Sequence, residues 1–171
     1  VRDMISGFFI LLEDQIRIGD YVQLNGTFGE VESIELRTIQ LRDPSGTVHV
    51  FQNGKIDTLA NMSKEWSAIV LDIGVAYKED LDHVSQVMEK VGNEMYNDVN
   101  YKNIMIEPLE IMGLNEFGDS ALIVRARLKT IPGVQWSTAR EYRKRLKKAF
   151  DKEKIEIPFP LLYKSSTSDD D

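Results

Sequence analysis

The most constraining feature of the sequence is a series of short alternating segments between residues 19 and 56, each bounded by turn residues. Asn-Gly at residues 25–26 is a strong signal for a two-residue hairpin, because both residue types tolerate a positive φ. Residues 44–46 (Pro-Ser-Gly) and 53–54 (Asn-Gly) mark two further turns. Strands this short, spaced by about 8–12 residues, indicate a small antiparallel barrel or sandwich.

One of these segments contains a histidine between two valines. His49 alternates with Val48 and Val50, so we expect it to point away from their face and toward solvent.

A strongly apolar run precedes the series and leads into it through a charged joint. The run contains Gly7, Phe8, Phe9, Ile10, Leu11 and Leu12, and the joint contains Arg17, Gly19 and Asp20. The run is shorter than the ~20 apolar residues that cross a bilayer. It also lacks the basic flank and small-residue cleavage site of a signal peptide. Its apolar side chains would cover most of the circumference of a helix, which suits either a helix that caps the open end of a barrel or the end of a helix that faces neighbouring helices.

The second half of the chain reads as alternating strands and helices. Residues 69–75 are apolar on both faces at their start and predict a central strand, and Asp80 is a plausible N-cap for a helix ending near Tyr96. Residues 104–111 predict a strand whose Pro108 favours an edge position, followed by a turn at residues 115–119.

The remaining elements complete the second unit. Residues 121–128 alternate as a half-buried strand, residues 137–152 repeat apolar side chains at helical spacing, and residues 155–157 predict a last short strand. The order strand, helix, strand, strand, helix, strand is the ferredoxin-like βαββαβ unit. The fold class is therefore α+β, with an acidic stretch from residue 165 to residue 171 at the end.

Composition and motifs argue against an enzyme. The sequence has no cysteine, which excludes disulfides, thiolate catalysis and zinc-thiolate sites and fits a reducing cytoplasm. Glu79, Asp80, Asp82 and His83 resemble a metal cluster, but carboxylates are favoured at a helix start and the spacing of a known metal site is absent. No glycine-rich phosphate loop occurs. We therefore predict no catalytic residue, no metal and no cofactor.

A cluster of basic residues in the last helix raises the question of nucleic-acid binding. It contains Arg140, Arg143, Lys144, Arg145, Lys147 and Lys148. We interpret it as a solvated helix face, because an RNA-recognition sheet needs aromatic residues that the predicted strands lack. The net charge of −7 also argues against a surface that binds nucleic acid or anionic lipid.

Taken together, the motifs resemble the small-conductance mechanosensitive channel (MscS-like) family, over residues 7–160. The matching segments are the apolar run at residues 7–10, the joint at 16–22, Gly26, residues 29–31, the turn Asn53, Gly54 and Lys55 with Ile56, and residues 73–77 and 155–160. The resemblance implies the following division: a remnant of the last membrane helix and joint (1–15), an Sm-like β-barrel (16–66), a ferredoxin-like domain (67–160) and a C-terminal extension (161–171). The first residue is Val1 rather than methionine, and we read the chain as the soluble part of a longer membrane protein.

The resemblance also implies a function and a state of assembly. It implies a homo-oligomeric channel of the inner membrane, heptameric in the best-known members, whose cytoplasmic vestibule passes ions and small solutes under osmotic stress. We expect subunit contacts along the barrel edges and at Pro158, Phe159, Pro160, Leu161 and Tyr163. The bilayer would be contacted through upstream helices, and no nucleic acid is expected as a partner.

Two departures from the family pattern and two alternative functions stand beside this reading. Gln52 replaces a proline in the turn before Asn53, and Lys154 replaces a helix-ending glycine, which is unfavourable by about 1 kcal/mol if its φ is positive. The alternatives are an RNA-binding Sm/ferredoxin-like protein and a small-molecule-binding regulatory module.

Overall fold

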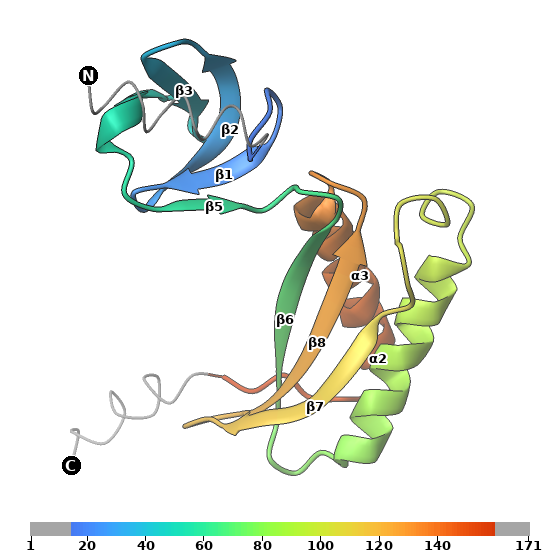
Figure 1. The fold of residues 1–171 in the computed structure, drawn as a ribbon. Coiled ribbons are helices and arrows are strands. Elements are labelled where there is room, and N and C mark those ends of the chain that lie inside the picture. The colour runs from blue at the N-terminus through green and yellow to red at the C-terminus, as the bar shows by residue number, and fades with distance from the viewer. Residues whose placement is uncertain (1–14, 160–171) are drawn as a thin grey trace, which may run out of the picture. The chain divides into compact units, whose positions relative to one another are not determined.

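The computed structural model describes residues 15–159 and divides the chain into two compact units between Ser67 and Ala68. The described part of the first unit contains five strands and one short 3₁₀ helix, whereas the second combines strands with two α-helices (Figure 1). The chain is α+β, as the sequence predicts. The apolar run at residues 7–12 and the acidic stretch at 165–171 lie outside the described residues.

The first unit is built around one antiparallel sheet with the strand order β4-β3-β2-β1-β5. Its elements are β1 (Tyr21–Leu24), β2 (Thr27–Ile34), β3 (Thr38–Arg42), β4 (Val48–Gln52), the 3₁₀ helix η1 (Asn53–Lys55) and β5 (Leu59–Asn61). The hairpin prediction is confirmed, because Asn25 and Gly26 between β1 and β2 have φ values of 50° and 86°. The buried apolar side chains of this unit are Ile16, Val22, Leu24, Val31, Ile39 and Leu41.

The predicted orientation of β4 is wrong. His49 pairs with the buried Leu41 and shares its face, whereas Val48 and Val50 are 38% and 59% exposed. The imidazole Nε2 of His49 lies 2.9 Å from Asp43 Oδ2, which gives its polar edge a partner on the inner face. This contact, together with the backbone N–H groups of Thr47 and Ser45, lowers the pKa of Asp43. The register with β3 thus places His49, and not the two valines, on the side of the buried Leu41.

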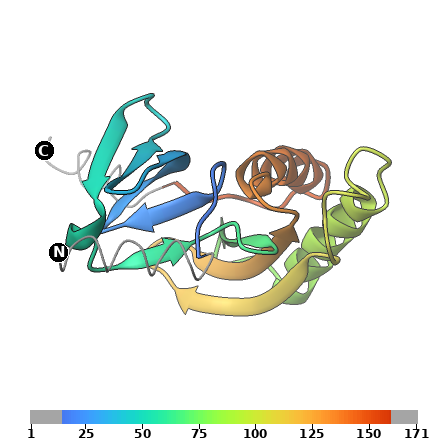
Figure 2. The same ribbon diagram turned by 45° about the horizontal axis from the view of Figure 1, so that its top comes forward.

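In the second unit two helices cover one face of a three-stranded sheet with the order β6-β8-β7 (Figure 2). Its elements are β6 (Ser67–Val75), α2 (Leu81–Tyr96), β7 (Glu110–Phe117), β8 (Leu122–Thr130) and α3 (Gln135–Lys152). The predicted alternation in β8 is confirmed, since every second residue from Leu122 to Thr130 is buried. The two helices and the sheet close over one apolar core that includes the fully buried Tyr142 and Met88.

Local chemistry explains where the helices begin and end. The Asp80 side chain accepts a hydrogen bond from the Asp82 N–H, so the predicted N-cap of α2 is confirmed. At the end of α3 the N–H groups of Lys154 and Ile155 bond to the carbonyls of Asp151 and Phe150, which is the Schellman arrangement. Lys154 has a φ of 57°, so it occupies the left-handed position that a glycine fills more easily.

Three predictions for the second unit need correction. β6 is an edge strand of the described sheet rather than a central one, because residues 155–157 contribute a single backbone bond, from Ala76 N to Glu156 O at 3.0 Å, and no ladder. The strand predicted at 104–111 is confirmed only in part: β7 begins at Glu110, and before Pro108, Met105 forms only an isolated antiparallel bridge with Thr130. The turn predicted at 115–119 lies at 118–121, because β7 runs on through Phe117.

Candidate functional site at the joint before β1

The joint, residues 15–20, is tied to the first unit by one asparagine of β5. The Asn61 side-chain N–H donates to the carbonyl of Gln15 at 2.8 Å and to the carboxylate of Asp20 at 3.0 Å. The same Asp20 oxygen accepts from the backbone N–H of Arg17 at 3.0 Å. Ile16 between them is only 4% exposed and belongs to the core. The chain therefore enters the unit through a fixed turn rather than through a loose linker.

Further backbone contacts hold the joint from the other side. Gly19 has a φ of 94° and donates its N–H to the Val31 carbonyl at 2.8 Å, a conformation that a side chain would strain. Tyr21 N–H donates to Ser63 Oγ at 2.9 Å, and Ser63 N–H donates to Asn61 Oδ1 at 2.9 Å. A polar hollow of about 460 Å³ lies beside this network. It is lined by Gln15, Arg17, Asp20, Asn61, Ser63, Lys64 and Glu65.

The sequence singled out Arg17, Gly19 and Asp20 but missed Asn61 and Ser63. Both lie more than 40 positions from the residues that they hold, and no local pattern marks such a contact. Asn61 and Ser63 come close to their partners only when β5 pairs with β1 in the folded chain.

The turn at Asn53, Gly54 and Lys55 is a packing element of the same unit. Asn53 is 1% exposed, and its side-chain N–H groups donate to the carbonyl of Leu36 at 3.0 Å and, more weakly, to that of Glu35. Gln52, which stands where the resemblance implies a proline, ends β4 and has a φ of −76°, close to the value that a proline ring imposes. The backbone at Gln52 is thus one that a proline could also adopt.

The residue that ties the hairpin turn to this segment is Asn25, which the sequence indicated only as a turn former. Its side-chain N–H donates to the Lys55 carbonyl at 2.8 Å. Its side-chain oxygen accepts from the N–H groups of Asp57 and Thr58 at 2.8 and 3.1 Å. A single side chain thus fixes the chain between η1 and β5.

At the other end of the described chain, apolar side chains lie at the surface. Ile155 is buried, whereas Ile157 is 50% exposed and Phe159 is 84% exposed. Pro158 lies between them and is half-buried. Pro160, Leu161 and Tyr163, the other predicted contacts, lie outside the described residues.

The basic helix α3 has one structural cation and a row of solvent-facing ones. Arg145 lies 2.8 Å from Asp98, 3.1 Å from Glu141 and over the ring of Tyr101. The backbone N–H of Asn100 and this guanidinium lower the pKa of Asp98. Arg140, Arg143, Lys144, Lys147 and Lys148 are exposed, as a solvated face requires. The packing role of Arg145 was not apparent from the sequence, because its partner Asp98 comes from the turn after α2.

The residues that resemble a metal cluster have other partners. The carboxylate of Glu79 accepts from the Glu156 N–H, Asp80 caps α2, and His83 lies 3.8 Å from Glu153. Within residues 15–159 no group of three or more acidic, histidine or cysteine side chains is arranged to hold a metal ion.

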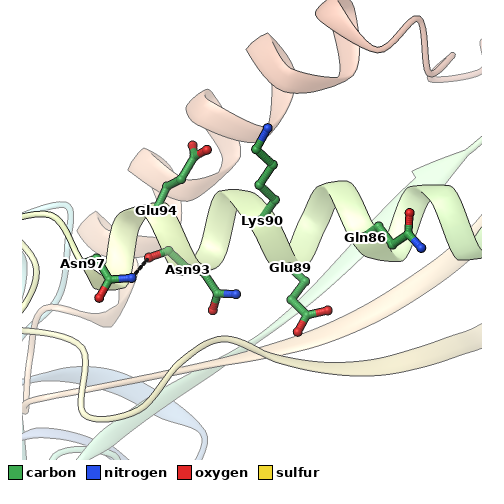
Figure 3. Close-up of a pocket in the computed structure, with 6 residues that line it drawn as sticks. All are labelled: Gln86, Glu89, Lys90, Asn93, Glu94 and Asn97. Atoms are coloured by element: carbon green, nitrogen blue, oxygen red, sulfur yellow. Dashed lines mark hydrogen bonds between the residues drawn. The ribbon is translucent and has the colours of Figure 1, made fainter.

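An open hollow of about 470 Å³ on α2 is bounded by that helix alone. Its lining residues are Gln86, Glu89, Lys90, Asn93, Glu94 and Asn97 (Figure 3). The polar contact drawn there is the bond from the Asn97 side chain to the Asn93 carbonyl at 2.9 Å, which closes the end of the helix. The hollow has no buried reactive group, so it has the character of a helix surface.

The face of the sheet opposite the helices is charged rather than aromatic. Arg125 forms a two-bond pair with Asp72 at 2.9 and 3.0 Å, and Arg127 contacts Glu110 at 3.0 Å. β6 and β8 contain no aromatic residue on which a base could stack. The RNA-binding alternative is therefore not favoured.

The order of a small β unit and an α+β unit defines the class of the protein: it has the fold of the MscS channels. The chain resembles the crystal structure of Helicobacter pylori MscS in its closed state, with a TM-score of 0.73 and 26% identity over 92% of this chain and 62% of that one. The structure of Arabidopsis thaliana MSL1 shares the fold, with a TM-score of 0.63 and 17% identity over 92% of this chain and 58% of that one.

Sequence comparison gives the family directly. Residues 1–64 match the family described as "Mechanosensitive ion channel, beta-domain", and residues 69–157 match "Mechanosensitive ion channel MscS, C-terminal". The chain belongs to the MscS family of mechanosensitive ion channels, which is a family of channels and not of enzymes.

Curated relatives agree with this assignment. The chain is 36% identical to the small-conductance mechanosensitive channel of Caldanaerobacter subterraneus over 94% of this chain and 56% of the relative. It is 26% identical to the moderate conductance mechanosensitive channel YbiO of Escherichia coli over 92% of this chain and 21% of the relative. The chain thus spans about half, or less, of the length of these relatives. Among its described residues, no helix is both long enough and apolar enough to cross a membrane.

Proposed function

We propose that this chain is the cytoplasmic vestibule part of a tension-gated channel that releases ions and small solutes under osmotic stress. The observation that carries the proposal is the match of two consecutive MscS family regions, which together cover residues 1–64 and 69–157. The relatives are roughly twice the length of the chain or longer, which leaves room in them for a membrane part. The inner membrane is the proposed location of the whole protein.

The fixed joint suggests what the first unit does in such a channel. Membrane tension does work equal to tension times the gain of in-plane area, so it favours the wider state of the membrane part. A pore helix leading into residues 15–20 would be held where Asn61 and Asp20 fix the joint. The first unit would then resist widening of the pore, and the second would form the wall through which solutes pass.

Assembly into a closed ring, as a homo-heptamer, is part of the proposal. A ring requires a head-to-tail interface that closes on itself. Two surfaces offer apolar contact: β4, an edge strand of the described sheet with Val50 59% exposed, and the segment at Ile157 and Phe159. The unpaired backbone N–H and C=O groups of an edge strand are a template for pairing with another chain, and exposed apolar side chains add a contact surface.

The test uses the full-length gene product in a membrane patch under suction, with survival of an osmotic downshift as a second readout. We expect tension-dependent currents, and we expect Asn61→Ala to lower the opening tension because the joint restrains the pore less. Asn93→Ala, an exposed asparagine on α2, is the control and leaves the opening tension unchanged. Currents absent from the unaltered protein would refute the channel function, whereas equal opening tensions would refute only the role of the joint.

A further inference from the structure

The groove between α2 and α3 combines an apolar floor with cations that lack an acidic partner. It has a volume of about 290 Å³ and is lined by Val87, Lys90, Val91, Glu94, Arg145, Lys148, Ala149, Lys152 and Glu153. Figure 3 shows Lys90 and Glu94 extending from one side of α2 and Glu89 and Asn93 from the other. The floor side chains Val87 and Val91 are 7% and 5% exposed.

The cations of the groove differ in whether an acidic side chain neutralises them. Arg145 is neutralised by Asp98 and Glu141. The side-chain ammonium groups of Lys90, Lys148 and Lys152 form no ion pair or hydrogen bond with any of residues 15–159. Of the two carboxylates in the lining, Glu153 lies 3.8 Å from His83, and Glu94 faces the lysines without a hydrogen bond. Lys148 and Lys152 also continue a row with Arg140 and Lys144 at four-residue spacing, and like charges at that spacing repel one another.

In a chain with a net charge of −7, this row is a local concentration of positive charge. Repulsion along one face of a helix is relieved when an anionic partner binds there. The sequence itself supplies such a partner, because residues 169–171 are three consecutive aspartates, preceded by a polar stretch from residue 165.

The path of the chain brings the aspartates within reach of the groove. Glu156 is held at the start of α2, where its carboxylate lies 2.9 Å from Lys78 and its N–H donates to Glu79 at 3.0 Å. From the start of α2 to Lys90 is about 14 Å along the helix. Residues 157–169 can extend about 40 Å. We propose that residues 169–171 dock on the Lys90–Lys148–Lys152 groove of their own chain and neutralise it.

The experiment uses two spin labels in the 171-residue chain. Because the sequence has no cysteine, Ser168→Cys and Asn93→Cys place the labels on the tail and one helical turn from Lys90. Doubly labelled chain diluted with unlabelled chain reports distances within one chain. We expect a narrow short-distance component at low salt that disappears at about 1 M salt, where the Debye length is about 3 Å.

Matched charge variants decide whether the groove is responsible. K90Q/K148Q/K152Q is expected to lose the short component, whereas K55Q/K64Q/K102Q, which removes three lysines elsewhere, keeps it. A broad distribution in every variant would overturn the proposal. So would a short component that survives K90Q/K148Q/K152Q, or one that appears equally when chains labelled only at residue 168 are mixed with chains labelled only at residue 93.

Discussion

At the scale of single residues, the end of α3 has a residue whose type is disfavoured by its backbone conformation. Lys154 adopts a φ of 57° in a Schellman arrangement that a glycine would enter freely. Lys154→Gly is therefore expected to raise the free energy of unfolding by about 1 kcal/mol. Urea unfolding followed by circular dichroism measures this change.

The control for that prediction lies on the same helix. Lys148→Gly removes the same side chain from an exposed helical position and is expected to lower the free energy of unfolding by about 1 kcal/mol. Equal effects of the two substitutions would contradict the assignment of strain to Lys154.

Asp98 makes the stability of the second unit depend on pH. Its pKa is lowered in the folded chain by the Asn100 N–H and by Arg145, so its contribution is fully present above the unfolded pKa of about 3.9 and is lost as pH falls through the folded pKa. Asp98→Asn should therefore lose less stability than the unaltered chain between pH 7 and pH 3. Urea midpoints across this range test it. Asp119→Asn, in the exposed β7–β8 turn, is the control and should follow the unaltered chain.

At the scale of elements, a single glycine sets how closely α2 approaches the segment before β7. A Cβ on Gly92 would lie 2.8 Å from the Cβ of Leu109. Alanine favours a helix by about 1 kcal/mol over glycine, but overpacking costs about 1–3 kcal/mol. Gly92→Ala is thus expected to be neutral or destabilising by up to about 2 kcal/mol. Thermal unfolding of Gly92→Ala, and of Gly92→Ala combined with Leu109→Gly, which removes the clashing Cβ, measures how far the clash is relieved.

The double substitution distinguishes a packing effect at Gly92 from an effect of helix propensity. If the contact with Leu109 decides, the second substitution costs less in the Gly92→Ala background than alone. Asn93→Ala, one position further along and exposed, is expected to stabilise slightly. Stabilisation by Gly92→Ala alone, equal to that of Asn93→Ala, would show that the helix has room at this position.

At the scale of the whole molecule, the outward face of β4 should govern association. Val50 is 59% exposed on an edge strand of the described sheet, so Val50→Lys is expected to reduce the mass of the assembled species. The unfolding free energy of the subunit should change by no more than about 0.5 kcal/mol. Light scattering at matched concentrations measures the mass. Val99→Lys, at an 84% exposed position in the second unit, is the control, and an equal loss of mass in both variants would argue against a specific role of β4.

The parts of the fold that the sequence determined are those with short-range causes. The Asn25–Gly26 hairpin, the Asp80 cap and the alternation of β8 depend on residues a few positions apart, so their local pattern was sufficient. The family motifs, because they are spread in a fixed order along the chain, were likewise readable without coordinates.

What only the tertiary structure decided depends on contacts between distant residues. The outward turn of Val50 follows from the register in which β4 pairs with β3, and the edge position of β6 follows from the failure of residues 155–157 to form a ladder. The hydrogen bonds from Asn61 to Gln15 and from Arg145 to Asp98 each join residues that lie more than 40 positions apart. Such hydrogen bonds form only when the chain has folded. Therefore neither periodicity nor local propensity predicts them.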